Sequence, residues 1–580
     1  MNLLPLPRRV RKLAGYCAKP RRITRVLEPV NRPEAEAYRL SIAKDGITLR
    51  AATPAGLFYA EQTLAQLREE NEKRLPCMEI TDWPDFPVRG FYHDVTRGKV
   101  PTLKTLLELA ETCARYKINQ LQLYVEHTYA YKNHPEVWKN SGALTAKEIK
   151  TLDARCAELH IDLVPSFSTF GHFYTWIHNK FPELNELERD VSGEPFCWWD
   201  RMMHYTLDCQ NPKSIEIVRE MIREVRPLFR SKYFNLCADE TFDLGTGRNK
   251  ALAEKVGKGR LYVDFLKQIM AAVKEADAIP MFWGDIIGHY PELLPEIPTE
   301  AIALDWDYGP ELKSTKAELM EKSGRAFYIC PGVSGWNAWL PNYGRAYKNI
   351  TRFAKVGRKH GASGLLNTDW GDFGHVNTLG TTLPGLITGA CSGWHVQSPA
   401  LQLARFEKTV SQTCLGDSTG KLLELLSKYA GSSKATWPMV CWMYQPRSKD
   451  FPDDWFDAAS GLPNDVLKNP AEAHVQALKK LQTLQKRIEK ILTRCRPKDR
   501  LIVKEIQVGM LGMQVMEEIY LVRLHRAGKL SKSAVNPKES ARRIGKLEHD
   551  LSFVWNKRNK PSELFRIQTV LKAIVKDLGK

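Results

Sequence analysis

Two patterns of hydrophobic and polar residues alternate along the middle of the chain. Short apolar runs have the composition of buried strands, and stretches with apolar residues every three or four positions follow most of them and predict amphipathic helices. The strand-like runs are 88–95, 120–125, 161–166, 233–238, 279–283, 301–306, 326–330 and 364–368. The helices predicted between them include 103–116, 145–159, 214–229, 261–276 and 347–359.

Eight strand-like runs separated mostly by helices predict a (β/α)8 TIM barrel, which belongs to the α/β class. A doubly wound open sheet is the competing topology. The number of units and the absence of a Gly-x-Gly-x-x-Gly turn favour the barrel, which we expect over residues 87–397. In such a barrel the residues directly after each strand gather at one catalytic face.

A small N-terminal α/β domain is expected over residues 1–86. It begins with a strand near 22–27, and the turn Lys44-Asp45-Gly46 then joins the alternating strands 38–42 and 46–50 into a hairpin. A helix over 55–70 follows, and the proline-rich stretch 82–87 is typical of a linker.

A helical C-terminal domain is expected over residues 398–580. Strand signals fade there, and the pattern predicts helices over 503–524 and 541–554. Leucine and isoleucine also recur at helical spacing, at Leu478, Leu481, Leu484, Ile488 and Ile491. Because this repeat is short, we expect its apolar stripe to pack against the barrel or a neighbouring helix and not to form a free coiled coil.

The net charge of +18 is concentrated at the two ends of the chain. Residues 1–27 contain eight Lys or Arg and no acid, and residues 476–580 contain 25 Lys or Arg against ten acids, so that 28–475 carries about −5. A nucleic-acid partner would need a positive field along a recognisable site, and no DNA- or RNA-binding motif accompanies these charges. We therefore expect solvated helix faces and no nucleic-acid partner, with a weak anionic partner as the alternative.

The sequence also indicates where the protein resides. No apolar stretch approaches the roughly 20 residues that span a bilayer, so we expect no membrane partner. The start of the chain places its arginines after a short apolar stretch broken by proline, which is the wrong order for a secretory signal. We expect a cytoplasmic protein, or an exported one whose signal lies outside this sequence; the arginine-rich start also permits an organelle transit peptide.

Twelve cysteines are scattered along the chain without a Cys-x-x-Cys pair. This pattern favours reduced thiols and gives no support to a metal site or a cofactor.

Two adjacent acids, Asp239 and Glu240, follow the strand-like run 233–238. Side chains that are neighbours on an extended strand point to opposite faces, so we expect these two carboxylates to have different roles. An ordinary solvated acidic turn is the alternative, since charged residues are mostly exposed.

Other polar and aromatic residues follow the remaining strands. Four tryptophans and several acids converging on one face would form a sugar pocket, because indole faces stack on the C–H surface of a pyranose and carboxylates accept from its hydroxyls. Any one of these tryptophans alone would more often be a core residue, but four at equivalent strand ends favour a site. The set comprises Asp94, Arg97, Glu126, His127, His172, Trp283, Asp285, Trp306, Asp307, Tyr308, Trp336, Asp369, Trp370 and Asp372.

With these residues in view, the sequence resembles glycoside hydrolase family 20, the β-N-acetylhexosaminidases. The resemblance covers the small N-terminal α/β domain, with its segment 52–57, and then the barrel from Arg89-Gly90 to Gly393-Trp394, and the helical 398–580 lies outside it. Its motifs are Asp94-x-x-Arg97, Phe170-Gly171-His172, Asp239-Glu240 and Trp370-Gly371-Asp372.

The resemblance implies a retaining mechanism in which the 2-acetamido oxygen of the substrate is the nucleophile. It makes Glu240 the general acid and later the base, and Asp239 the ionised group that orients the acetamide and stabilises the oxazolinium intermediate. It also implies that His172, with Glu126 behind it, supports the acid; a packed loop histidine is the alternative.

The resemblance further implies a set of sugar-binding residues. Arg97 would hold the O3 and O4 hydroxyls, and Asp372 would bind O4 or O6. The aromatic walls would be Trp283, Trp306, Trp336 and Trp370.

One segment departs from the family pattern. The family places a tyrosine after strand seven to bind the acetamide oxygen, but residues 330–337 here read Cys-Pro-Gly-Val-Ser-Gly-Trp-Asn. Tyr308 and Asn337 are two candidates for a replacement, and the sequence does not choose between them.

We therefore expect an exo-acting β-N-acetylhexosaminidase that removes terminal GlcNAc or GalNAc from a glycan with retention, without a metal or cofactor, and with a homodimer left open. Three alternatives remain. They are a glycosidase for another sugar that uses a carboxylate nucleophile, a non-catalytic glycan-binding protein, and a scaffold or anionic-polymer binder that depends on the basic helices.

Overall fold

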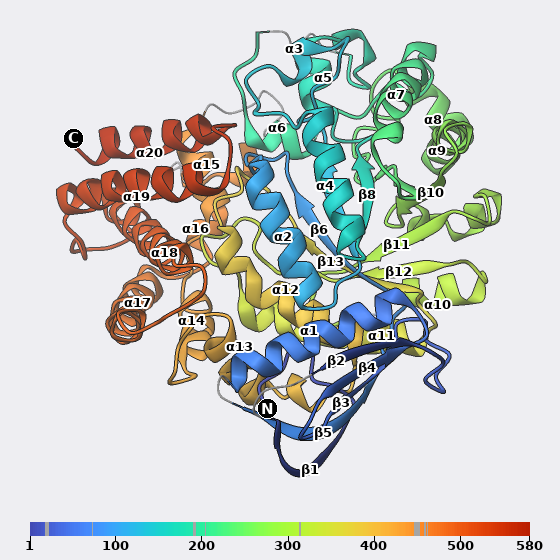
Figure 1. Cartoon of the computed structure of the whole chain (residues 1–580). Coiled ribbons are helices and arrows are strands. Elements are labelled where there is room, and N and C mark those ends of the chain that lie inside the picture. The colour runs from blue at the N-terminus through green and yellow to red at the C-terminus, as the bar shows by residue number, and fades with distance from the viewer. Residues whose placement is uncertain are drawn as a thin grey trace.

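The structure is a computed structural model that describes residues 1–17, 22–71, 74–188, 193–203, 205–312, 315–445, 453–457, 460 and 462–579. Three parts follow one another along the chain: an N-terminal sheet, a closed barrel and a C-terminal group of helices (Figure 1).

The N-terminal part is a sheet of order β1-β5-β3-β4-β2 with one helix against it. The pairs are antiparallel except β2 with β4. The hairpin and helix are confirmed, whereas strands β1 and β5 were not predicted. The elements are β1 (Arg9–Cys17), β2 (Ile23–Leu27), β3 (Tyr38–Ile42), β4 (Ile47–Ala51), α1 (Pro54–Glu70) and β5 (Leu75–Asp82).

One expectation for this part was wrong. The basic residues between 9 and 17 lie on the exposed edge strand β1 and not on a helix face. The stretch 82–87 runs from the end of β5 to β6 and is packed against the barrel, because Asp82 and Phe86 are buried and the Asp85 amide donates to the Trp394 carbonyl at 2.8 Å.

The barrel predicted from the sequence is confirmed. In the described part of the chain eight parallel strands close in the order β10-β11-β12-β13-β6-β7-β8-β9, with β13 paired to β6. The strands are β6 (Val88–Asp94), β7 (Gln120–Val125), β8 (Asp162–Phe167), β9 (Tyr233–Asn235), β10 (Ile279–Trp283), β11 (Ile302–Trp306), β12 (Phe327–Cys330) and β13 (Gly364–Asp369).

Helices lie around the barrel and in its loops (Figure 1). Local capping explains some of their ends; for example, Thr145 and Glu148 form a capping box at the start of α4. The outer helices are α2 (Leu103–Arg115), α4 (Ala146–Glu158), α7 (Pro212–Val225), α9 (Lys258–Glu275), α10 (Thr315–Lys322), α11 (Tyr343–Lys359) and α12 (Leu379–Trp394). Shorter loop helices are α3 (Pro135–Trp138), α5 (Tyr174–Asn179), α6 (Trp198–Met203) and α8 (Lys250–Val256).

Strand β9 is shorter than predicted. The Asn235 side chain accepts a hydrogen bond from the Cys237 amide at 3.0 Å, and Cys237 and Ala238 take φ values of 58° and 66°. The backbone therefore leaves the extended conformation before it reaches Asp239.

The C-terminal region is helical, as predicted, and packs against the side of the barrel (Figure 1). Helix α18 approaches the loop after β12 so closely that a Cβ on Gly512 would lie 2.3 Å from the Trp339 ring. Its helices are α13 (Leu403–Thr413), α14 (Leu422–Ala430), α15 (Trp437–Tyr444), α16 (Asn464–Leu467), α17 (Ala471–Leu492), α18 (Leu501–Arg526), α19 (Pro537–Arg558) and α20 (Leu564–Leu578).

Two further sequence expectations can be compared with these coordinates. The structure describes all twelve cysteines, and each is a free thiol. Within the described ranges, every helix is too short or too polar to cross a bilayer.

Candidate active site

A cavity of about 170 Å³ opens at the carboxyl ends of the barrel strands. It brings together most of the residues that the sequence proposed for the site and adds Met202 from α6. Its lining residues are Arg97, Met202, Asp239, Glu240, Trp306, Tyr308, Trp336, Trp370 and Asp372.

The two adjacent acids share a single partner, His172. The His172 Nε2 atom lies 3.4 Å from Glu240 Oε2 and 3.8 Å from Asp239 Oδ2. The expectation that the acids point to opposite faces of a strand was wrong, because β9 ends before them and Glu240 itself has a φ of 49°. Asp239 is buried, while 30% of the Glu240 side chain is exposed.

A glycine explains how His172 comes so close to the acids. A Cβ on Gly171 would lie only 2.5 Å from the Asp239 carbonyl oxygen. Only a residue without a side chain allows the loop after β8 to contact the loop after β9 this closely. The Phe170-Gly171-His172 segment is thus a packing requirement of the site.

Arg97 connects the acids of the site to one another. Its Nε donates to Glu126 Oε1 at 3.0 Å and its Nη1 to Asp372 Oδ1 at 2.7 Å. Its guanidinium carbon lies 5.1 Å from the centre of the Trp370 ring. Asp94 anchors this loop, because its carboxylate accepts from the amides of Arg97 and Gly371.

Glu126 lies beside two arginines. Besides Arg97, its carboxylate lies 3.4 Å from Arg201 of α6. Burial raises the pKa of Glu126, but the positive charges of Arg201, Arg97 and His172 outweigh burial and hold the pKa below its usual range. Glu126 is therefore an ionised carboxylate that acts on His172 through its field.

The pKa directions of the catalytic pair differ between the two acids. Burial raises the pKa of Asp239. Burial, the largest single cause, acts in the same sense on Glu240, but the contact with His172 and the positive charges of His172 and Arg97 together outweigh it, so the pKa of Glu240 is lowered. The pKa of His172 is raised, since its contacts with Glu240 and Asp239 outweigh its burial.

A third carboxylate, Asp285, lies behind the pair. Its Oδ2 accepts from the Glu240 amide at 3.2 Å, and its Oδ1 is buried without a hydrogen-bond partner. Burial and the neighbouring charge of Asp239 raise the pKa of Asp285 to about 7.

Aromatic rings form the floor and walls of the cavity. Trp283 is fully buried beneath Trp370, with ring centres 5.7 Å apart. The Trp370 indole donates to the Tyr308 hydroxyl at 2.6 Å, and Trp306 stacks on Tyr308 at 5.2 Å. The Tyr308 ring lies 4.8 Å from that of Trp336.

The two candidates for the missing acetamide-binding tyrosine differ in position. Tyr308 lines the cavity, with its hydroxyl held by Trp370. Asn337 is not among the cavity-lining residues, and its Oδ1 is buried. The geometry thus favours Tyr308 over Asn337.

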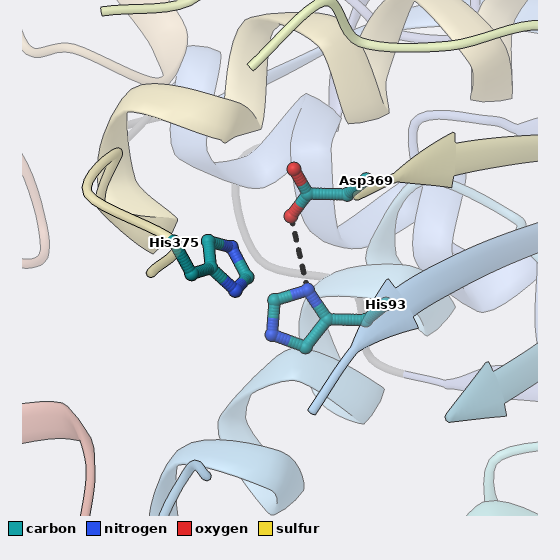
Figure 2. A group of neighbouring side chains, drawn as sticks. All are labelled: His93, Asp369 and His375. Atoms are coloured by element: carbon teal, nitrogen blue, oxygen red, sulfur yellow. Dashed lines mark hydrogen bonds and ion pairs between the residues drawn. The ribbon is translucent and has the colours of Figure 1, made fainter. Parts of the chain in front are cut away.

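Asp369, expected at the mouth, belongs to a different group. Its Oδ2 accepts from His93 Nδ1 at 2.9 Å, and the His375 ring faces this pair (Figure 2). The three side chains bring possible metal-ligand atoms within 4.8 Å of one another. The hydrogen bond joins the carboxyl ends of β6 and β13, so His93 and Asp369 form a side-chain cross-link between these two paired strands.

Comparison with known proteins agrees with this fold. The chain matches glycosyl hydrolase family 20, domain 2, over residues 9–83 and the catalytic domain of the same family over residues 86–355. The chain belongs to glycoside hydrolase family 20. The helical region from 398 onward lies outside both matches.

Individual relatives are distant. The chain is 25% identical to β-hexosaminidase subunit A1 of Dictyostelium discoideum over 298 residues, covering 48% of this chain and 53% of that one. It thus spans about half the length of the curated relatives it matches.

Solved structures share the fold at low identity. A β-N-acetylhexosaminidase from Bacteroides fragilis has a TM-score of 0.58 at 17% identity and covers 71% of this chain and 94% of its own. A chitobiase from Flavobacterium johnsoniae has a TM-score of 0.57 at 17% identity and covers 100% of this chain and 99% of its own.

Proposed function

We propose that this protein is an exo-β-N-acetylhexosaminidase that removes terminal GlcNAc or GalNAc from glycans with retention. The observation that carries the proposal is the pair of acids Asp239 and Glu240, which share His172 at the end of an aromatic cavity sized for one sugar ring. Family membership and the names of the relatives support the same substrate class.

The two acids divide the chemistry between them. Glu240, the more exposed, protonates the leaving oxygen and later removes a proton from water. Asp239, the more buried, accepts the acetamide N–H, so that the acetamide oxygen attacks the anomeric carbon, and it then stabilises the charge of the oxazolinium intermediate.

These roles require the pKa order of the pair to reverse when the sugar binds. An acetamide N–H donated to Asp239 stabilises the charged form and lowers its pKa. The sugar also displaces water from around Glu240, which favours the neutral form and raises its pKa. With substrate bound, Glu240 would therefore be protonated and Asp239 ionised.

The remaining cavity residues recognise the sugar. Arg97 donates to the O3 and O4 hydroxyls, and Asp372 accepts from O4 or O6. Trp306, Trp336 and Trp370 enclose the ring and the acetamide methyl, and the buried Trp283 supports Trp370 from behind. Tyr308 donates its hydroxyl proton to the acetamide oxygen, because it lines the cavity and its oxygen is already oriented by Trp370.

The direct test is turnover of aryl N-acetyl-β-glucosaminide and N-acetyl-β-galactosaminide by the wild type, Asp239→Asn and Glu240→Gln. We expect turnover by the wild type, inhibition by a thiazoline that mimics the oxazolinium ion, and large losses in both variants. Equal rates in all three proteins would reject the assignment. Cleavage of aryl glucosides without an acetamide at the same rate would favour a carboxylate nucleophile.

A further inference from the structure

The C-terminal helical region contacts the catalytic face through Glu563, the residue before α20. Glu563 is only 6% exposed, and its Oε2 lies 2.6 Å from Arg201 Nη1. Its amide also donates to the Gly98 carbonyl at 3.1 Å, one residue after Arg97. Glu563 is thus fixed on both sides against loops of the active site.

Arg201 carries this contact into the site. Its side chain is buried, and its Nη2 donates to the Thr96 carbonyl at 2.8 Å and lies 3.4 Å from Glu126. Glu126 in turn holds Arg97 at 3.0 Å. A continuous chain of buried charges therefore runs from Glu563 through Arg201 and Glu126 to Arg97, which lines the cavity.

The segment that carries Arg201 rests on the C-terminal helices. The Trp199 ring lies 5.6 Å from Trp442 of α15 and 4.7 Å from Trp455. One turn earlier, the Arg566 guanidinium of α20 lies 3.5 Å from the centre of the Phe196 ring. The same segment supplies Met202 to the cavity wall.

The charge balance explains why Glu563 matters to Arg97. Arg201 has two carboxylate partners, and Glu126 is shared between Arg201 and Arg97. If Glu563 lost its charge, Arg201 would draw Glu126 toward itself, because a buried guanidinium needs a full counter-charge. Glu126 would then hold Arg97 less firmly.

We infer that Glu563 is a positioning residue for the active site and that it orients Arg97 through Arg201 and Glu126. The helical region outside the family match is therefore part of the catalytic unit. This inference rests on the proposed function only for the identity of the sugar that Arg97 binds.

The test compares Glu563→Gln with the wild type on two substrates, an aryl N-acetyl-β-glucosaminide and its 4-deoxy analogue. We expect kcat/KM for the full substrate to fall about tenfold, because small displacements of a binding group are costly. For the 4-deoxy analogue we expect a smaller loss, of about threefold, because one of the two hydroxyls that Arg97 holds is absent. Glu563→Asp, which keeps the charge, should recover part of the loss.

A matched control is Glu548→Gln. Glu548 lies on α19 and pairs at 3.8 Å with Lys572 of α20. It therefore belongs to the two helices on either side of Glu563 but does not contact Arg201, Glu126 or Arg97. It should leave both rates unchanged. If Glu563 had a purely structural role, Glu563→Gln would lower kcat/KM for both substrates by the same factor. That result, or an unchanged kcat/KM for both substrates, would overturn the inference.

Failure of the proposed function would look different, because the wild type itself would not turn over either substrate. In that case a crystal structure of Glu563→Gln decides the inference: the Arg97–Glu126 contact should lengthen, and an unchanged contact would overturn it. If Glu563→Gln does not fold, the same measurements are made on Glu563→Asp. We then expect a smaller loss of kcat/KM for the full substrate and a smaller change in the Arg97–Glu126 distance. Equal losses of kcat/KM for the two substrates would overturn the inference.

Discussion

Two clusters of buried charged residues, one around Asp82 and one around Asp239, lie at opposite ends of the barrel and differ in how their polar atoms are satisfied. At the end facing the N-terminal sheet, Asp82 accepts from Lys117 at 2.9 Å, Tyr38 at 2.7 Å, Trp394 at 3.0 Å and the Arg8 amide at 3.1 Å. At the catalytic end, Asp239 Oδ1, His172 Nε2 and Asp285 Oδ1 are buried without a protein hydrogen-bond partner.

This difference separates stability from function. Buried polar groups are normally satisfied, since an unsatisfied one costs free energy of folding. The network around Asp82 follows that rule and joins the sheet to the barrel. The catalytic end leaves polar atoms to be satisfied by a substrate, so we expect substitutions there to affect turnover and substitutions around Asp82 to affect unfolding.

Glu240→Gln should have the largest effect and should act on turnover alone. Loss of a general acid lowers kcat/KM by about 10²- to 10⁴-fold. The amide retains the size of the side chain, so the thermal unfolding midpoint should stay within a few degrees of the wild type. A variant that loses its fold together with its activity would contradict the separation.

Asp82→Asn should have the opposite signature. Breaking a buried ion pair leaves Lys117 without its counter-charge and lowers the free energy of unfolding by about 3–5 kcal/mol. Chemical denaturation measures this loss, while kcat of the folded fraction should be unchanged. The control is Glu79→Gln on the same strand, whose exposed pair with Arg11 contributes about 0.5 kcal/mol or less.

Asp285 makes the comparison depend on pH. The pKa of Asp285 is about 7 in the folded chain, against 3.8 for an ordinary aspartate, so folding takes up a proton between these values. The stability that this proton contributes is present below about pH 4 and is lost as the pH rises through about 7.

Asp285→Asn should remove this dependence, because the amide does not titrate and still offers an oxygen to the Glu240 amide. We expect the free energy of unfolding of the wild type, relative to the variant, to fall by about 2 kcal/mol between pH 5 and pH 8. Parallel pH profiles for the two proteins would show that Asp285 titrates normally.

Tyr308→Phe should have the smallest effect of the catalytic variants. Loss of one hydrogen bond to the acetamide oxygen should lower kcat/KM for N-acetyl substrates about tenfold. Stability should change little. The control is Tyr347→Phe, whose hydroxyl donates to the Leu401 carbonyl outside the cavity and should not affect turnover. If kcat/KM of Tyr308→Phe equals that of the wild type, Tyr308 does not donate a hydrogen bond to the acetamide oxygen.

Much of the fold could be predicted because the barrel strands are buried on both faces. Strands β7 and β10 were predicted to the residue: β10 is a continuous apolar run, and β7 alternates glutamine with leucine before ending in Tyr124 and Val125. Strand β1 was missed because it is an edge strand with mostly exposed, basic residues. Strand β9 was predicted too long, because the apolar run continues through Ala238 although Cys237 and Ala238 take positive φ values.

The candidate site was predictable only where residues follow strands closely. Trp370 follows β13 directly, Arg97 and Asp239 lie in the loops that follow β6 and β9, and the barrel topology brings the three together. Arg201 and Met202 lie on a short loop helix, and Glu563 is 362 residues from Arg201 along the chain. No periodicity or motif in the sequence predicts such a contact. A buried arginine such as Arg201 can be recognised only when the structure shows which carboxylates lie next to it.

The central claim is that the acetamide of the substrate is the nucleophile, with Asp239 and Glu240 assisting it. The most direct measurement is kcat/KM for a series of aryl β-glucosaminides whose N-acetyl group carries zero, one, two or three fluorines. Fluorine withdraws electrons from the acetamide oxygen, so we predict a steep and progressive fall in kcat/KM along the series. A rate that does not change with fluorination would contradict the claim and indicate a different nucleophile.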